Sequence, residues 1–169
     1  MKLPEHLLEQ ADALIDPASR GRPRQADLRR AVSAAYYALF HFLIDEACTL
    51  MLGARAHAGL GNLMRRAFDH GPMKQVSESF SAKLKPAHRA ALGGVDVPPP
   101  LQRVAAAFFE LQKKRHEADY NLGVRFIRRD VRKLVDQARD AIGDWERIRD
   151  SDAARVYLLL LLIGSRIRE

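Results

Sequence analysis

The sequence is poor in features that define several common protein classes. It contains a single cysteine, Cys48, among 169 residues. One thiol excludes an internal disulfide framework and cannot by itself form a structural zinc site. Because a free cysteine usually behaves as a small apolar side chain, we expect Cys48 to lie in the core.

Long apolar runs and the pattern of a secretory leader are also missing. The N-terminal stretch MKLPEHLLEQADALID contains several acidic residues and no apolar run, unlike a signal peptide. The longest apolar stretch, residues 156–163, has eight residues, whereas a membrane-spanning helix needs roughly 20. These observations predict a cytoplasmic protein with no membrane partner.

Motifs for cofactors and metals are lacking as well. Neither GxxxxGK[ST] nor GxGxxG occurs, so a glycine-rich loop that cradles phosphates is unsupported. His57, His70 and His88 have no companion at the spacing of metal ligands. We therefore expect no metal and no cofactor.

Positive charge is what the chain has in excess. Lysine and arginine number 28 against 21 acidic residues, for a net charge of +7. The excess is clustered in residues 20–30, 113–115 and 125–133. Such clusters favour a polyanionic partner such as RNA. A solvated basic surface without a partner is the alternative.

Apolar residues recur every three or four positions along most of the chain, and no strand-like alternation reaches a useful length. Helices are predicted near residues 7–15, 28–51, 57–68, 101–120, 127–148 and 153–166. Gly71 and Pro72 are expected to interrupt the third, with a further helical turn or two near residues 74–84. Residues 85–100 contain four prolines and a glycine pair, so most of them are expected to form a loop. We predict one all-α domain, residues 1–169, folded as an antiparallel bundle of about five to six helices. Its core would cover residues 25–150, around a long second helix, and residues 153–166 would form an apolar C-terminal helix.

The helix near residues 101–120 carries a charge in line with its apolar stripe. After Phe108 and Leu111, the next position in register is Arg115. A guanidinium there must be paired, and Asp119, one turn later, is the nearest local candidate. Alternatively, Arg115 reaches solvent from the end of the bundle and is paired only to remain satisfied.

Two further polar rows lie beside the apolar stripes. One contains Gln112, His116 and Tyr120, and the other, on the second helix, contains Ser33, Tyr37, His41 and Asp45. If these helices are antiparallel neighbours, the rows meet in a polar cleft. Arginine binds phosphate in bidentate fashion, and histidine exchanges protons near neutral pH. The combination suits RNA cleavage through a 2′-hydroxyl and suits phosphate binding equally well.

Three segments resemble signature blocks of bacterial members of the HEPN (higher-eukaryote and prokaryote nucleotide-binding) superfamily. They are RRAVSAAYYALFHFLIDEA at 29–47, MRRAFDHGPMK at 64–74 and LQKKRHEADYNLGVRF at 111–126. The blocks occur in the expected order and, with the intervening helices, cover most of residues 25–150. AYYALFH followed by R-H-x-A-D-Y is a fairly specific combination.

The resemblance implies an all-α bundle that commonly dimerises. Many members are RNA-cleaving toxins or defence nucleases, and others pair with a nucleotidyltransferase encoded beside them. The nuclease members carry an arginine followed, after four to six residues, by a histidine. Here His116 follows Arg115 at once, and no histidine occupies the usual window. Arg65 and His70 have the spacing but belong to the earlier block.

Two hypotheses follow. The first is a HEPN protein that binds RNA or a nucleotide or phosphate in the polar cleft, as part of a toxin–antitoxin or defence system. The alternative is a metal-independent endoribonuclease with Arg115 and His116 at a dimer cleft; a third variant makes Tyr120 the acceptor of a nucleotidyl group. Expected partners are a second copy of the chain, RNA and a nucleotidyltransferase-type antitoxin. The expected catalytic residues are Arg115, His116 and Asp119, and the expected ligand-binding residues are Tyr37, His41, His70, Lys114, Tyr120 and Asn121.

Overall fold

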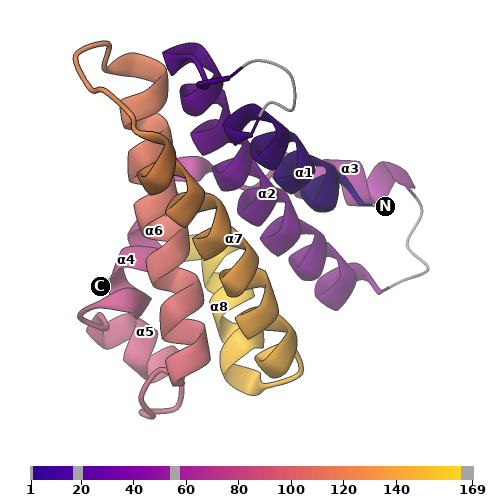
Figure 1. Cartoon of the computed structure of the whole chain (residues 1–169). Coiled ribbons are helices and arrows are strands. Elements are labelled where there is room, and N and C mark those ends of the chain that lie inside the picture. The colour runs from indigo at the N-terminus through magenta and orange to yellow at the C-terminus, as the bar shows by residue number, and fades with distance from the viewer. Residues whose placement is uncertain (1, 17–20, 54–57, 165–169) are drawn as a thin grey trace.

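The computed structural model describes residues 2–16, 21–53 and 58–164, and within them it contains helices and no strand (Figure 1). The helices are α1 (Leu3–Ile15), α2 (Gln25–Leu52), α3 (Ala58–Arg65), α4 (His70–Ser81), α5 (Pro86–Ala91), α6 (Pro99–Tyr120), α7 (Arg128–Ile148) and α8 (Asp152–Ile163). The predicted all-α bundle is confirmed. The described helices number eight, more than the five to six expected.

The centre of the fold is a bundle of α2, α6 and α7 (Figure 1). α2 and α6 are antiparallel, because Ser33 near the start of α2 bonds Asp119 near the end of α6. α6 and α7 are also antiparallel, because Arg103 near the start of α6 pairs with Asp144 near the end of α7. Because α6 is antiparallel to both α2 and α7, α2 and α7 run parallel to each other. This corrects the expectation that the three helices form a wholly antiparallel bundle.

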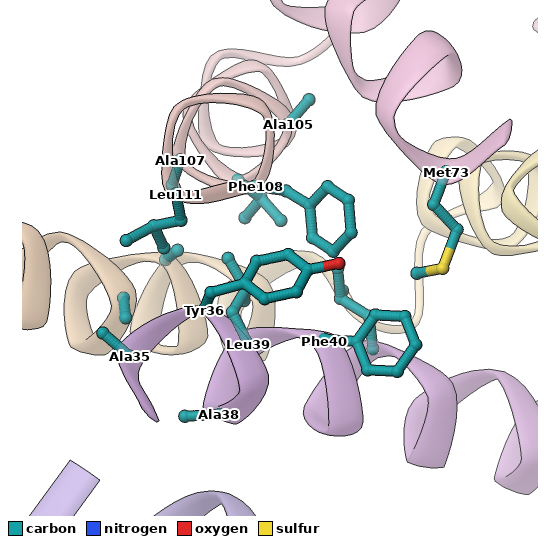
Figure 2. Packing of buried hydrophobic residues seen from close by; sticks show 14 of the residues in the cluster. Ala35, Tyr36, Ala38, Leu39, Phe40, Met73, Ala105, Ala107, Phe108 and Leu111 are labelled. Atoms are coloured by element: carbon teal, nitrogen blue, oxygen red, sulfur yellow. The ribbon is translucent and has the colours of Figure 1, made fainter. Parts of the chain in front are cut away.

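α2 is the central helix because it is buried along most of its length. α1 packs beside it, and the apolar residues Leu8, Ala11 and Ile15 of α1 are buried. Tyr36 of α2 is fully buried; Figure 2 shows its ring between Phe108 of α6 and Phe40 of α2. The start of α2 thus lies against the end of α6, where the candidate site is found.

The structure differs from the prediction between residues 69 and 100. Gly71 and Pro72 do not interrupt a helix; they lie in the first turn of α4, where the Asp69 carboxylate accepts a hydrogen bond from Gly71 N. Proline is tolerated in a first turn, because the first N–H groups of a helix have no partner within it. For the same reason α5 begins at Pro86 and α6 at Pro99. The loop expected at residues 85–100 is therefore wrong for residues 86–91 and 99–100.

The last two helices follow the expected periodicity with small deviations. Ile127, expected within the apolar stripe, is the exposed N-cap of α7. α8 buries Tyr157, Leu158, Leu160 and Leu161 against α4 and α2, whereas Leu159 faces outward. The predicted end of this helix near residue 166 lies outside the described residues, as do Pro17 and His57.

Two further expectations concern α2. Cys48 is buried, as predicted for a small apolar side chain. Among the described helices, α2 is long and apolar enough to cross a bilayer by length and composition alone. Half of that apolar window is buried inside the chain, and the central helix of any globular bundle has this character.

Candidate functional site

The two polar rows meet where the start of α2 packs against the end of α6. Arg115 Nε lies 2.7 Å from Asp119 Oδ2, and Arg115 Nη2 donates to the Tyr37 hydroxyl at 2.8 Å. The Ser33 hydroxyl donates to Asp119 Oδ1 at 2.7 Å. Only 18% of the Arg115 side chain is exposed, so the charge is paired within the bundle, as its register predicts. We call Ser33, Tyr37, Arg115 and Asp119 the polar seam.

Aromatic rings surround the Arg115 guanidinium. Its central carbon lies 6.0 Å from the ring centre of Tyr36, 5.4 Å from that of Tyr37 and 5.9 Å from that of Tyr120. A cation near the face of an aromatic ring is stabilised by the electrons of the ring. These rings and the Asp119 carboxylate explain how an arginine occupies a position in line with the core.

His70, the first residue of α4, adjoins the seam from the other side of Tyr36. Its Nδ1 lies 2.6 Å from the Tyr36 hydroxyl, and its ring centre lies 4.4 Å from that of Phe40. Burial lowers the pKa of His70, and the Arg115 charge lowers that pKa further. Burial raises the pKa of the Tyr36 hydroxyl, which keeps its proton.

The tautomer of His70 follows from this contact. Among the described residues, His70 is the hydrogen-bond partner of the buried Tyr36 hydroxyl. We therefore assign the Tyr36 hydroxyl as the donor and His70 Nδ1 as the acceptor of this hydrogen bond, which places the imidazole proton on Nε2. In this state His70 Nε2 is a donor for a hydrogen bond, not a proton acceptor.

His41 extends the polar row along α2. Its ring stacks beside Tyr37, with 6.1 Å between ring centres. Burial lowers the pKa of His41, while Asp45 opposes that shift. Asp45, at the end of the row, forms an ion pair with Arg65 at 2.7 Å. The polar seam thus borders His41 and His70, and burial lowers the pKa of both and so favours their neutral forms.

Three of the predicted site residues lie apart from the Arg115 guanidinium. His116 is exposed and its ring contacts Tyr120, with centres 4.9 Å apart. Lys114 pairs with Glu117 at 2.8 Å. The Asn121 side chain accepts a hydrogen bond from Gly123 N and so stabilises the turn after α6. Tyr37, Asp119 and Tyr120 do contact Arg115, and His41 and His70 border the seam through Tyr37 and Tyr36.

Arg29 is a residue that the sequence reasoning missed. Its guanidinium donates to five carbonyl groups at and after the end of α6, including Ala118 O at 2.7 Å and Val124 O at 2.5 Å. The last carbonyls of a helix have no partner within it, so a cation there satisfies them. Gln25 adds bonds to both backbone groups of Phe126. Arg29 thereby fixes the turn next to Asp119, a role that no spacing in the sequence indicates.

A groove of about 350 Å³ adjoins the polar seam between α1, α2 and α6. Its lining residues are Leu7, Gln10, Arg29, Arg30, Ser33, Ala34, Tyr37 and Asp119. Arg30 is exposed, and Arg115 lies directly behind Tyr37 and Asp119. Two arginines and one aspartate line the groove, and Arg115 pairs with that aspartate from behind, so the local charge favours an anion.

A second cavity, of about 390 Å³, lies between α6 and α7 and has a different charge. Its lining residues are Glu110, Lys114, Glu117, Val124, Arg125, Phe126, Ile127, Asp130, Lys133, Leu134 and Gln137. Acidic and basic side chains are equal in number there, so this cavity has no net attraction for an anion.

No protein-family model, curated protein or solved structure matches the chain. Among the described residues, no group of histidine, cysteine, aspartate and glutamate side chains is arranged to hold a metal ion. The chemistry of the polar seam and its groove therefore has to be inferred from their own residues.

Proposed function

We propose that this chain is a HEPN-type protein that binds RNA, with the phosphate backbone in the groove beside the polar seam. The observation that supports this proposal is the groove itself, which Arg29 and Arg30 line together with Asp119, while Arg115 pairs with that aspartate from behind. Asp119 is held by Arg115 and Ser33, so its negative charge is largely compensated. Arg30 and the Tyr37 hydroxyl then provide a cation and a donor for phosphate oxygens.

The basic cluster at residues 125–133 offers less free charge than its composition indicates. Arg128 and Arg132 both form ion pairs with Asp16 of α1. Arg129 has Asp130 as a neighbour at 3.5 Å. Because these contacts compensate much of the charge of α7, the groove at the start of α2 is the better position for an RNA backbone.

Charge reversal at the groove tests the proposal. Arg30→Glu should weaken binding of a fluorescein-labelled RNA by about tenfold or more, because a phosphate contact becomes a repulsion. Arg155→Glu, on α8, makes the same change of charge beside Asp152 and should change the affinity less than about twofold. Fluorescence anisotropy at one fixed salt concentration measures both. Equal loss in the two variants, or no binding by the native chain, would refute the proposal.

Metal-independent endoribonuclease activity is the second candidate. One observation favours it: Arg115 and His70 both contact Tyr36, which brings together an arginine and a histidine suited to phosphate chemistry. In this reaction His70 takes the proton of a 2′-hydroxyl as that oxygen bonds to phosphorus, and the bond to the 5′-oxygen breaks. A 2′,3′-cyclic phosphate results, the 5′-oxygen takes a proton from water, and the hydroxide that remains takes the proton from His70. The reaction requires the other tautomer of His70, so we place binding first.

The two candidates are separated by incubating purified protein with mixed cellular RNA in the presence of EDTA. If the protein is a nuclease that uses His70, the native chain cleaves the RNA. The His70→Ala variant then fails to cleave it, and the His116→Ala variant still does. The reverse result for the two histidines would return catalysis to Arg115 and His116. RNA that stays intact with protein that binds it would exclude the nuclease.

The remaining proposals rest on the sequence resemblance. They are a homodimer, a nucleotidyltransferase-type antitoxin partner and a toxin–antitoxin or defence role; a cytoplasmic location is proposed from the short apolar runs of the sequence instead. Size-exclusion chromatography with light scattering tests the dimer, and co-purification with the product of a neighbouring gene tests the partner.

A further inference from the structure

The last turn of α6 carries two aromatic rings that the fold leaves uncovered. Tyr120 is 66% exposed, and its ring centre lies 4.9 Å from that of His116, which is also exposed. Within the described part of the chain, the Tyr120 hydroxyl has no hydrogen bond. A tyrosine that stabilises a fold usually buries its ring and bonds its hydroxyl. Tyr120 does neither, so its ring is available to a ligand.

These rings continue the polar seam onto the surface. With 3.6 residues per turn, Arg115, Asp119, His116 and Tyr120 follow one another around α6, from the side nearest α2 outward. The Arg115 guanidinium lies 5.9 Å from the Tyr120 ring and bonds Tyr37 on its other side. Asp119 lines the groove and immediately precedes Tyr120 in α6, so the Tyr120 ring lies beyond the lining, on the α6 side of the groove.

One lysine and one exposed leucine lie near the rings. Lys113 is exposed about two turns before Tyr120 on a similar side of α6. Leu122, just after the helix, is 87% exposed. An exposed aromatic pair between a basic groove and a lysine is the combination used for single-stranded nucleic acids, because every base has a face that stacks and every nucleotide has a phosphate.

We propose that Tyr120 and His116 form a stacking platform for an unpaired base of an RNA whose phosphates lie in the adjoining groove. This inference rests on the proposed RNA binding. It adds that the RNA bound at this site is single-stranded. Within a duplex the faces of the bases are covered by their neighbours and only the two end pairs expose a face, so a duplex gains little from the platform. Stacking tolerates any base, so the platform contributes affinity and little sequence preference.

Removal of the ring, compared with removal of the hydroxyl alone, tests the platform. The probes are a short single-stranded oligoadenylate and a blunt RNA duplex of the same length, measured by fluorescence anisotropy. Tyr120→Ala should bind the single strand about tenfold more weakly, as expected for the loss of one base–ring stack. Tyr120→Phe keeps the ring and should stay within about twofold of the native protein. Neither variant should change binding of the duplex.

Other outcomes distinguish failure of the platform from failure of RNA binding. If Tyr120→Ala binds the single strand like the native protein while Arg30→Glu loses affinity, the platform is wrong and the groove stands. If Tyr120→Ala weakens single strand and duplex equally, stacking is also wrong. If the native protein binds neither probe, the proposed function fails and the platform fails with it. Thermal unfolding of each variant confirms that this exposed position leaves the fold intact.

Discussion

The first half of α6 and its last two turns use the same helical register for opposite purposes. In the first half, Leu101, Val104 and Phe108 are fully buried among apolar side chains. In the last turns the register reaches Arg115, whose charge is held by Asp119, Tyr37 and aromatic rings. The first half stabilises the bundle by burial, whereas the second places polar groups beside a groove.

The difference shows where stability and function separate in this chain. Burial of an apolar side chain stabilises the fold wherever water is excluded. In a closely packed core, the loss of even one methylene group lowers that stability. A paired arginine adds little net stability, because removing its charge from water offsets most of the attraction. Arg115 therefore has no strong structural reason to replace a leucine, which is why we assign it to function.

The largest effect is expected in the first half of α6. Leu101→Ala should lower the free energy of unfolding by about 3 kcal/mol, because it leaves a cavity in a fully buried position. Gln102→Ala, at the next and exposed position, should cost less than about 1 kcal/mol. Urea denaturation measures both. Equal costs would show that this half of the helix is not the stabilising one.

The turn that supports the polar end should be the next most sensitive. Arg29→Ala removes the donor to five carbonyl groups and should cost about 2 kcal/mol. Arg30→Ala, one residue later and exposed, should change stability by less than about 0.5 kcal/mol. Hydrogen exchange should become faster at residues 121–126 in the first variant only. Unchanged exchange there would contradict the role given to Arg29.

Arg115 itself should show a smaller effect on stability and a large one on binding. Arg115→Met keeps an unbranched chain in the core register, so stability should change by less than about 1.5 kcal/mol. RNA affinity should fall about tenfold or more, because the charge that compensates Asp119 is lost. Lys114→Met, which removes the neighbouring cation, is the control and should keep the affinity within about threefold. The comparison fails if Arg115→Met unfolds the protein or binds RNA normally.

The smallest effect is a dependence of stability on pH. Burial lowers the pKa of His70 and His41 in the folded protein. As the pH falls below the ordinary histidine pKa of about 6.5, the unfolded chain takes up protons before the folded one does. Stability should thus be greatest above that pH and decline as the solution becomes more acidic. His70→Gln should flatten the decline measured by thermal unfolding, and an unchanged slope would show that His70 is not buried as a neutral group.

The sequence predicted those parts of the fold that depend on periodicity. The apolar spacing located α2 and α6, and the register of Arg115 anticipated both its burial and its pairing with Asp119. The start of α4 at His70 was missed, because glycine and proline in a first turn resemble a break. Contacts between distant segments were missed for another reason, since no local pattern specifies them.

Arg29 and His70 illustrate that second reason. Arg29 bonds carbonyls about 90 positions away, and its residue type gives no sign of it. His70 meets Tyr36 only because α4 packs against α6 and its first residue reaches the side chains of α2. Arg115 and His116, the expected catalytic pair, extend from α6 in directions about 100° apart, as successive residues of a helix do, and the Tyr120 ring contacts both.

Photo-crosslinking tests the central claim most directly, because it locates the bound RNA. A single-stranded RNA with 4-thiouridine is irradiated with the native protein, and the linked peptides are identified by mass spectrometry. We predict crosslinks within residues 29–37 of α2 and 115–122 at the end of α6. Crosslinks confined to α7 or α3 would contradict the assignment of the polar seam as the RNA-binding site.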